Sequence, residues 1–270
     1  MMQIRFLIVL FFISTFNSFG QDSNTVSNFT NRLGFVEGTR AIREKGLLAE
    51  INYSHSQTNY YRSGWVNPVE ILERQQTFPK INLGYGVANG VSIRFGIGLE
   101  KIWQTTEHWE KTYFFVNDIS FGSTINLSKQ KGIMPELALL VDLKFQLSGN
   151  YGLGVDVPWD VYGLVGFAWK YEIVKPLKIS GNFKYNGFNR GLLWGTKLNY
   201  EPINHLGIFT SVQASSWGLF DLQVELNGGL YYRFNSRIQI DLQGYHWIEY
   251  KDAENSNRNA FAIGFSWLFS

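Results

Sequence analysis

The sequence predicts an all-β protein: one closed, antiparallel, up-and-down transmembrane β-barrel of twelve strands. Three observations support this fold class. Apolar and polar side chains alternate in many segments, and the connections between these segments alternate between short and long. The composition is rich in aromatic residues (17%) and poor in charged residues (17%). A soluble domain usually carries about 25% charged residues, so the composition favours a membrane environment.

The N-terminus has the features of a secretory signal peptide over residues 1–20. Arg5 supplies a positive charge, residues 6–16 are almost wholly apolar, and small residues precede Gln21. This order is typical of export signals, and the run is shorter than the ~20 apolar residues of a membrane-spanning helix. An uncleaved anchor is therefore the weaker alternative. We expect cleavage of this signal, localisation in the bacterial outer membrane, a periplasmic or plug segment over 21–45, and the barrel over 46–270.

Composition excludes several other classes of protein. The chain has no cysteine and a net charge of +2, so we expect no disulfide framework, no thiolate metal site and no nucleic-acid partner. After the signal peptide, no apolar run reaches the ~18 residues of a transmembrane helix candidate. Two readings remain for such an exported chain, a secreted β-sandwich and a membrane β-barrel.

The alternation is clearest at the C-terminus. Large apolar residues occupy alternate positions from Phe261 to Phe269, with mostly small residues between them. A period of two is the pattern of a β-strand. The predicted strands reach the ~9–11 residues that tilted transmembrane strands need, whereas sandwich strands usually have about 5–6. They are 46–56, 78–88, 91–103, 112–126, 133–147, 158–174, 177–188, 192–202, 206–216, 222–234, 237–249 and 259–269.

The connections orient the barrel. Each even-to-odd connection contains a compact turn pattern, because Asn, Gly and Pro favour turn conformations: Ala88-Asn89-Gly90, Ser128 to Gly132, Lys175-Pro176, Ile203-Asn204-His205 and Asn235-Ser236. Membrane barrels have short periplasmic turns and longer outer loops. The odd-to-even connections are therefore predicted to be outer loops, and most are longer: 57–77, 104–111, 148–157, 217–221 and 250–258.

Patterns typical of catalysis are weak. None of the four histidines has a serine two residues later, the spacing that lipid-cleaving barrel enzymes typically have. His108 lies near Glu107 and Glu110, but in a predicted loop without metal-ligand spacing. No glycine-rich loop precedes a helix, as nucleotide binding would need. We therefore predict no catalytic residue, no cofactor site, no metal site and no enzymatic activity.

The functional candidates are charged residues that the alternation turns toward the lumen. Rings of charge can set the selectivity of a pore, but opposite charges on neighbouring strands can also simply pair with each other. The mixture of signs argues against strong ion selectivity, and twelve strands give a narrower lumen than the roughly 16–18-stranded porins. The candidates are Lys80, Arg94, Glu100, Asp118, Asp142, Lys144, Lys170, Lys184, Lys197, Glu225, Arg233 and Asp241.

Several short segments resemble a known family. The opening Asn31-Arg-Leu-Gly-Phe35, followed by Lys45-Gly46 and Glu50, is similar to that of the outer-membrane transporters grouped as the MetA-pathway of phenol degradation family. Later similar segments begin at Phe78, Leu83, Asp118, Pro135, Asp241 and Gly264. The resemblance implies a transport role in the outer membrane, with hydrophobic or aromatic compounds as a cargo class. The last strand, which ends at Phe269, also resembles the signal that the barrel assembly machinery recognises.

The sequence leaves three candidate functions for this chain. The first is a channel or transporter for small molecules, with outer-membrane lipid and a small-molecule solute as its partners. The second is a non-transporting barrel that anchors the envelope or binds a partner through its outer loops, especially 57–77. The third is a lipid-modifying barrel enzyme, whose Ser–His site would have to be assembled from separate strands.

Overall fold

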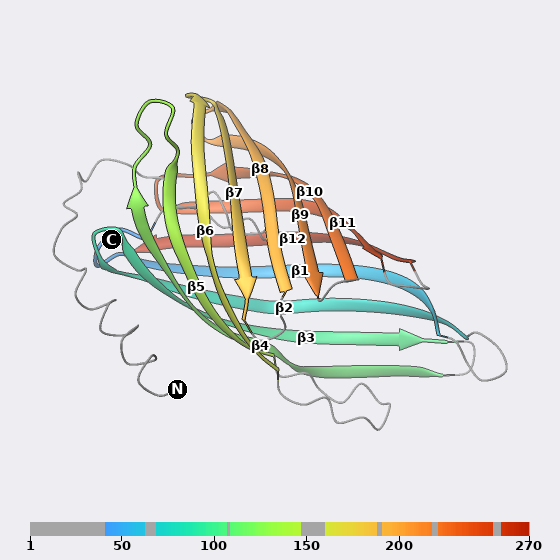
Figure 1. The fold of residues 1–270 in the computed structure, drawn as a ribbon. Helices are drawn as coiled ribbons and strands as arrows, with labels where there is room; N and C mark the ends of the chain where they lie inside the picture. The colour runs from blue at the N-terminus through green and yellow to red at the C-terminus, as the bar shows by residue number, and fades with distance from the viewer. Residues whose placement is uncertain are drawn as a thin grey trace.

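The polypeptide forms one closed sheet of twelve strands (Figure 1). The computed structural model describes residues 41–62, 69–106, 109–146, 160–187, 191–217, 221–250 and 255–269. The strands are β1 (Leu47–Arg62), β2 (Val69–Ala88), β3 (Val91–Thr105), β4 (Glu110–Ser128), β5 (Glu136–Gln146), β6 (Asp160–Val174), β7 (Leu177–Asn186), β8 (Gly191–Ile203), β9 (Leu206–Trp217), β10 (Asp221–Arg233), β11 (Ile238–Tyr250) and β12 (Asn255–Phe269).

Every strand pairs with its neighbours in the chain, and the last strand pairs with the first. All of these pairs are antiparallel, and β1 and β12 are in register from Leu47↔Phe269 to Thr58↔Arg258. Closure satisfies the backbone groups that an open sheet would leave at its edges. The predicted fold class, an up-and-down antiparallel barrel of twelve strands, is confirmed.

Compact turns connect β2–β3, β4–β5, β6–β7, β8–β9 and β10–β11 at one end of the barrel, which we call the short-turn end. Gly90 and Gly132 adopt φ values of +80° and +57° in two of these turns, a conformation that costs glycine little. In a third turn, the Asn235 side-chain oxygen accepts hydrogen bonds from the backbone N–H groups of Arg237 and Ile238 at 2.7 and 2.9 Å. These connections confirm the predicted turns.

The predicted outer loop 57–77 was wrong in its extent. Residues 57–62 and 69–77 continue β1 and β2, and they pair from Gln57↔Arg74 to Arg62↔Val69. The apolar alternation ends before this hairpin does, so it indicates strand ends that lie short of the true ones. A backbone ladder needs no apolar stripe, so the strands continue. A smaller error lies at residues 133–135, which belong to a turn, because β5 begins at Glu136.

The proposed signal peptide and most of the segment 21–45 lie outside the described residues. Residues 41–46 are described, and they precede β1. In the described part of the chain, no helix has the length and apolar character needed to cross a membrane.

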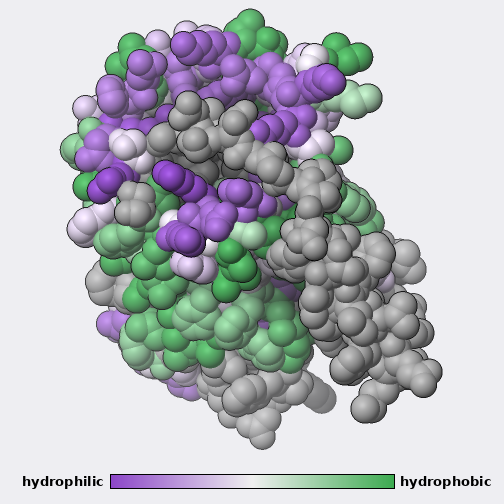
Figure 2. Space-filling view, turned by 90° about the vertical axis from the view of Figure 1, so that its left-hand side faces the viewer, coloured by the Kyte–Doolittle hydropathy of each residue, from purple (hydrophilic) through white to green (hydrophobic). Residues whose placement is uncertain are grey.

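The two faces of the barrel wall have opposite chemistry. On β12, Phe261 and Ile263 are 48% and 46% exposed, whereas Ala262 and Ser266 are 3% and 0% exposed. The outward side chains of the other strands are also mainly large and apolar, and on the face in Figure 2 they form a continuous area with hydrophilic residues above it. Soluble proteins rarely expose such large apolar surfaces, whereas a transmembrane barrel turns them toward lipid.

Outward aromatic rings gather at the short-turn end. The rings of Tyr232 and Phe234 meet edge to face with centroids 5.0 Å apart, and those of Trp267 and Phe269 stack at 4.6 Å. Aromatic girdles mark the membrane interfaces of β-barrels. This end of the apolar surface therefore has the chemistry of an interface.

Candidate functional site: the polar inner wall

The inner wall is mainly polar, with buried apolar side chains such as Ile102, Leu140 and Leu164 on β3, β5 and β6. It consists of the side chains that alternate with the outward apolar ones, and many of them are carboxylates, amines, amides and hydroxyls that are almost fully buried. Buried polar groups need hydrogen-bond partners. Within the described part of the chain, two networks of contacts between strands satisfy several of these groups.

The structure places the predicted charged residues as follows. Seven are between 1% and 8% exposed on the inner wall: Glu100, Asp142, Lys170, Lys184, Lys197, Glu225 and Asp241. Four are partly buried: Lys80, Arg94, Lys144 and Arg233. Asp118 lies on β4, where it pairs with Gly98 of β3 through the backbone, but its side chain is outside the described part.

The first network, the central triad, joins three of the predicted residues across alternate strands. The Asp142 carboxylate on β5 receives Arg94 Nη2 from β3 at 3.1 Å and Lys184 Nζ from β7 at 2.8 Å. Asp142 and Lys184 are both buried, so their charges depend on each other. Removing one partner of a buried ion pair leaves an uncompensated charge, which is strongly destabilising.

Glycines on the strands between make these contacts possible. A Cβ atom on Gly122 of β4 would lie 2.3 Å from Asp142 Oδ1, and one on Gly166 of β6 would lie 2.9 Å from Lys184 Cγ. Charged side chains thus lie directly over backbone that carries no side chain. Glycine within a strand often marks such a close approach.

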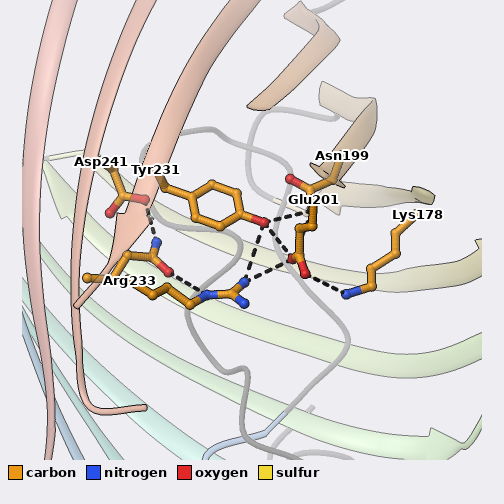
Figure 3. Close-up of polar contacts among 7 residues, drawn as sticks. Lys178, Asn199, Glu201, Tyr231, Arg233 and Asp241 are labelled. Atoms are coloured by element: carbon orange, nitrogen blue, oxygen red, sulfur yellow. Dashed lines mark hydrogen bonds and ion pairs between the residues drawn. The ribbon is translucent and has the colours of Figure 1, made fainter. Parts of the chain in front are cut away.

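The second network, the rim network, lies at the short-turn end and is centred on Glu201 of β8 (Figure 3). Its carboxylate contacts Arg233 Nη2 at 2.9 Å and Lys178 Nζ at 3.2 Å. The Tyr231 hydroxyl donates a 2.5 Å hydrogen bond to the same carboxylate, and Asn199 Nδ2 donates to the Tyr231 oxygen at 3.0 Å. Side chains from β7, β10 and β8 itself therefore converge on one acid.

The rim network continues onto β11. Arg233 Nε donates to Gln239 Oε1 at 3.3 Å, and Gln239 Nε2 donates to Asp241 Oδ1 at 2.5 Å. The charged members are two cations, Lys178 and Arg233, and two anions, Glu201 and Asp241. Because these charges balance, the network stabilises the wall and does not create a strongly charged ring.

Sequence reasoning missed five members of the rim network, among them the uncharged Asn199 and Gln239. The other three, Lys178, Glu201 and Tyr231, follow the same alternation as predicted residues on their own strands, which are Lys184, Lys197 and Arg233. Glu201 lies at the end of its predicted strand, where alternation gives little guidance. Tyr231 lies over Gly207, whose added Cβ would come 2.1 Å from the tyrosine ring, and only the register between strands reveals this approach.

The segment before β1, residues 41–46, lies against the inner wall at the short-turn end. Ile42 is buried against Leu48, and Leu268 packs beside them. The backbone N–H of Lys45 donates to the Gly86 carbonyl at 2.8 Å, and the Ala41 N–H donates to the Asn126 side-chain oxygen at 3.0 Å. We call residues 41–46 the inner strap.

Two glycines of β2 make room for the inner strap. A Cβ atom on Gly84 would lie 2.3 Å from Ile42 Cδ1, and one on Gly86 would lie 1.8 Å from the Arg43 carbonyl oxygen. Larger residues at these positions would force the strap away from the wall. The close contact between the inner strap and the wall therefore requires glycine at both positions.

The described histidines have the following partners. The His55 ring lies 5.6 Å from the Phe261 ring, while Nδ1 of His205 contacts the Arg233 carbonyl at 3.1 Å. His246 Nδ1 lies 2.7 Å from Asn259 Oδ1. His108 is outside the described residues. Within the described ranges, no three His, Cys, Asp or Glu residues form a group that could hold a metal ion.

Comparison with known proteins identifies the class of fold. No family model and no curated protein matches the chain. An outer-membrane channel from Pseudomonas putida F1 is similar, with 11% identity over 86% of this chain and 98% of that chain and a TM-score of 0.60. The NanC porin is also similar, with 11% identity over 81% of this chain and 98% of that chain and a TM-score of 0.52. These likenesses show the fold alone, which is that of an outer-membrane β-barrel. Membership of the MetA-pathway family stays a prediction.

Proposed function

We propose that this chain is an outer-membrane channel for small molecules. One observation carries the proposal: the strands that present an apolar outer surface also present polar side chains to the interior along the barrel. A barrel that served only as a packed anchor could fill its interior with apolar side chains, which need no hydrogen-bond partners. A polar interior instead provides hydrogen-bonding groups that can replace the water around a solute.

The chemistry of the inner wall favours hydrophilic cargo. Amides, hydroxyls and paired charges dominate β7 to β11, and the buried Phe209 is an apolar exception there. The family resemblance implies hydrophobic or aromatic cargo, which would find few complementary surfaces on this wall. We therefore infer a small hydrophilic solute, since both networks contain charges of both signs.

Liposome swelling tests the channel. Liposomes that contain the folded protein should swell in an isotonic glucose solution faster than protein-free liposomes. Swelling should slow as the solute grows from a monosaccharide to a tetrasaccharide, because a twelve-stranded lumen is narrow. Swelling no faster than in protein-free liposomes would contradict the proposal.

A non-transporting barrel is the second candidate, and the tight interior favours it. Gln239 and Ser266 are completely buried, and the inner strap covers part of the wall. Two results together would support this function over the channel. The folded protein would permit no solute flux, and its binding to the envelope or to a partner would depend on the β1–β2 hairpin.

We infer that the inner strap narrows the short-turn end of the lumen, in agreement with a plug role for the segment 21–45.

We also infer that a cleaved signal peptide exports the chain and that β12, with its outward residues from Phe261 to Phe269, is recognised by the barrel assembly machinery. Removal of residues 2–20 should leave the chain in the cytoplasm, and Phe269→Ala should slow its insertion into the outer membrane.

A further inference from the structure

We propose that the inner wall of β9, β10 and β11 holds a binding site for a neutral, polyhydroxylated solute of the small-saccharide class. The site consists of Gln213, Glu225, Asn227, Tyr245 and Trp247, and we call it the amide–aromatic site. The proposal rests on the channel function and specifies its solute class.

The register places these five residues together on one face of the wall. Glu225 of β10 is the direct partner of Gln213 on β9 and of Trp247 on β11. Asn227, two residues further along β10, is the direct partner of Tyr245. Directly opposed residues of antiparallel strands project to the same face. The five side chains therefore form one continuous patch across three adjacent strands.

Two acceptors in this patch have no hydrogen-bond partner among the residues that the structure describes. Gln213 and Asn227 are 7% and 5% exposed, yet Gln213 Oε1 and Asn227 Oδ1 make no hydrogen bond. Buried amide oxygens are normally satisfied, so this pair points to a donor supplied from the lumen. The hydroxyl groups of a saccharide are such donors.

The neighbouring groups complete the chemistry of saccharide recognition. Trp247 Nε1 donates a hydrogen bond to the Glu225 carboxylate and so holds it in place. The rings of Tyr245 and Trp247 lie 4.9 Å apart and are tilted by 59°. Their faces offer flat apolar surfaces for the C–H groups of a sugar ring, while amide and carboxylate oxygens accept bonds from its hydroxyls.

Charge makes a neutral solute the best fit. Glu225 places a carboxylate within the site, which disfavours anionic sugars because like charges repel. A calcium ion would need about 6–8 oxygen ligands, and only Gln213, Glu225 and Asn227 offer carboxylate or amide oxygens here. Lys197 on β8 pairs with Ser211, the β9 partner of Asn227, and its amine further disfavours a cation.

Current block in planar bilayers tests the site. Maltotriose added to the wild-type channel should interrupt the ionic current in a concentration-dependent manner. Asn227→Leu and Gln213→Leu should each weaken this block by about tenfold, as expected for the loss of one hydrogen bond worth about 1.4 kcal/mol. The matched control is Asn52→Leu, the same change at a buried amide on the inner wall of β1, and it should leave the block unchanged.

Several outcomes would overturn the proposal. Equal block in Asn227→Leu and Asn52→Leu would place the site elsewhere. Block by a trigalacturonate but not by maltotriose would mean an anion site, and block by calcium chloride alone would mean a cation site. If the wild-type protein conducts no current, the channel function fails, and calorimetric titration of maltotriose into the detergent-solubilised protein then decides the binding site separately. In that case, heat that is lost in Asn227→Leu supports the site, and no heat in the wild type overturns it.

Discussion

The inner wall has two contrasting regions. Over β1, β2 and β12 it carries small residues such as Gly84, Gly86 and Ala262, and the inner strap lies against it through Ile42. Over β7 to β11 it carries the rim network and the amide–aromatic site, in which side chains meet one another or leave acceptors open. Alternation decides only which residues face inward. The size and polarity of these inward residues then decide what lies beside the wall. Small residues leave room for the inner strap, whereas large polar residues fill the space with their own side chains.

The largest effect should come from the central triad, which extends from β3, beside the first region, to β7 in the second. Asp142→Asn leaves Arg94 and the buried Lys184 without their shared carboxylate, and loss of a partner in a buried ion pair costs about 3–5 kcal/mol. Urea unfolding in detergent, followed by tryptophan fluorescence, measures the change. The exposed Glu172→Gln on β6 is the control, and equal stability of the two variants would contradict the structural role of the triad.

A slightly smaller effect should come from the outer face. Ile263→Arg places a charge on the lipid side of β12, at a cost of about 2–4 kcal/mol near the bilayer midplane. Tyr232→Arg at the short-turn rim should cost only about 0–1 kcal/mol, because depth decides the penalty. Folding equilibria in lipid vesicles measure both. A reversed order would show that the apolar surface does not face hydrocarbon.

The rim network should contribute less than the central triad. Glu201→Gln removes the charge that Arg233 and Lys178 contact, and a hydrogen bond to a charged group contributes about 1.5–3 kcal/mol. We expect a loss at the lower end of this range, because both cations keep some solvent contact. The reversal potential of the channel in a salt gradient should shift little. A large shift would mean that this acid sets selectivity.

The smallest change in stability, but an informative one, should come from the inner strap. Gly86→Val should push the strap off the wall, raise the conductance and speed trypsin cleavage after the exposed Arg43 and Lys45, because the backbone of the strap loses its contacts with β2. Gly244→Val is the control, because the nearest atom to an added Cβ there lies 3.9 Å away. Unchanged conductance together with faster trypsin cleavage would show that the strap moves without narrowing the lumen.

Sequence reasoning predicted the elements that a two-residue period defines. β3 and β12 alternate cleanly, and each turn with Asn, Gly or Pro was located. The β1–β2 hairpin was shortened because its outer part lacks an apolar stripe. The contacts of Asp142 could not be predicted, because Arg94 and Lys184 lie on alternate strands and meet over Gly122 and Gly166. Such contacts depend on register and on the curvature of the closed barrel, which periodicity does not determine.

The most direct test of the central claim compares the two faces of one strand. The chain has no cysteine, so a single introduced cysteine is its only thiol. Ser211→Cys and Val212→Cys on β9 place that thiol on the buried inner face and the exposed outer face. A charged, membrane-impermeant methanethiosulfonate reagent should react with the first variant and reduce its current in planar bilayers, and leave the second unaffected. Equal reaction of both, or reaction of Val212→Cys alone, would contradict a polar lumen enclosed by a lipid-facing wall.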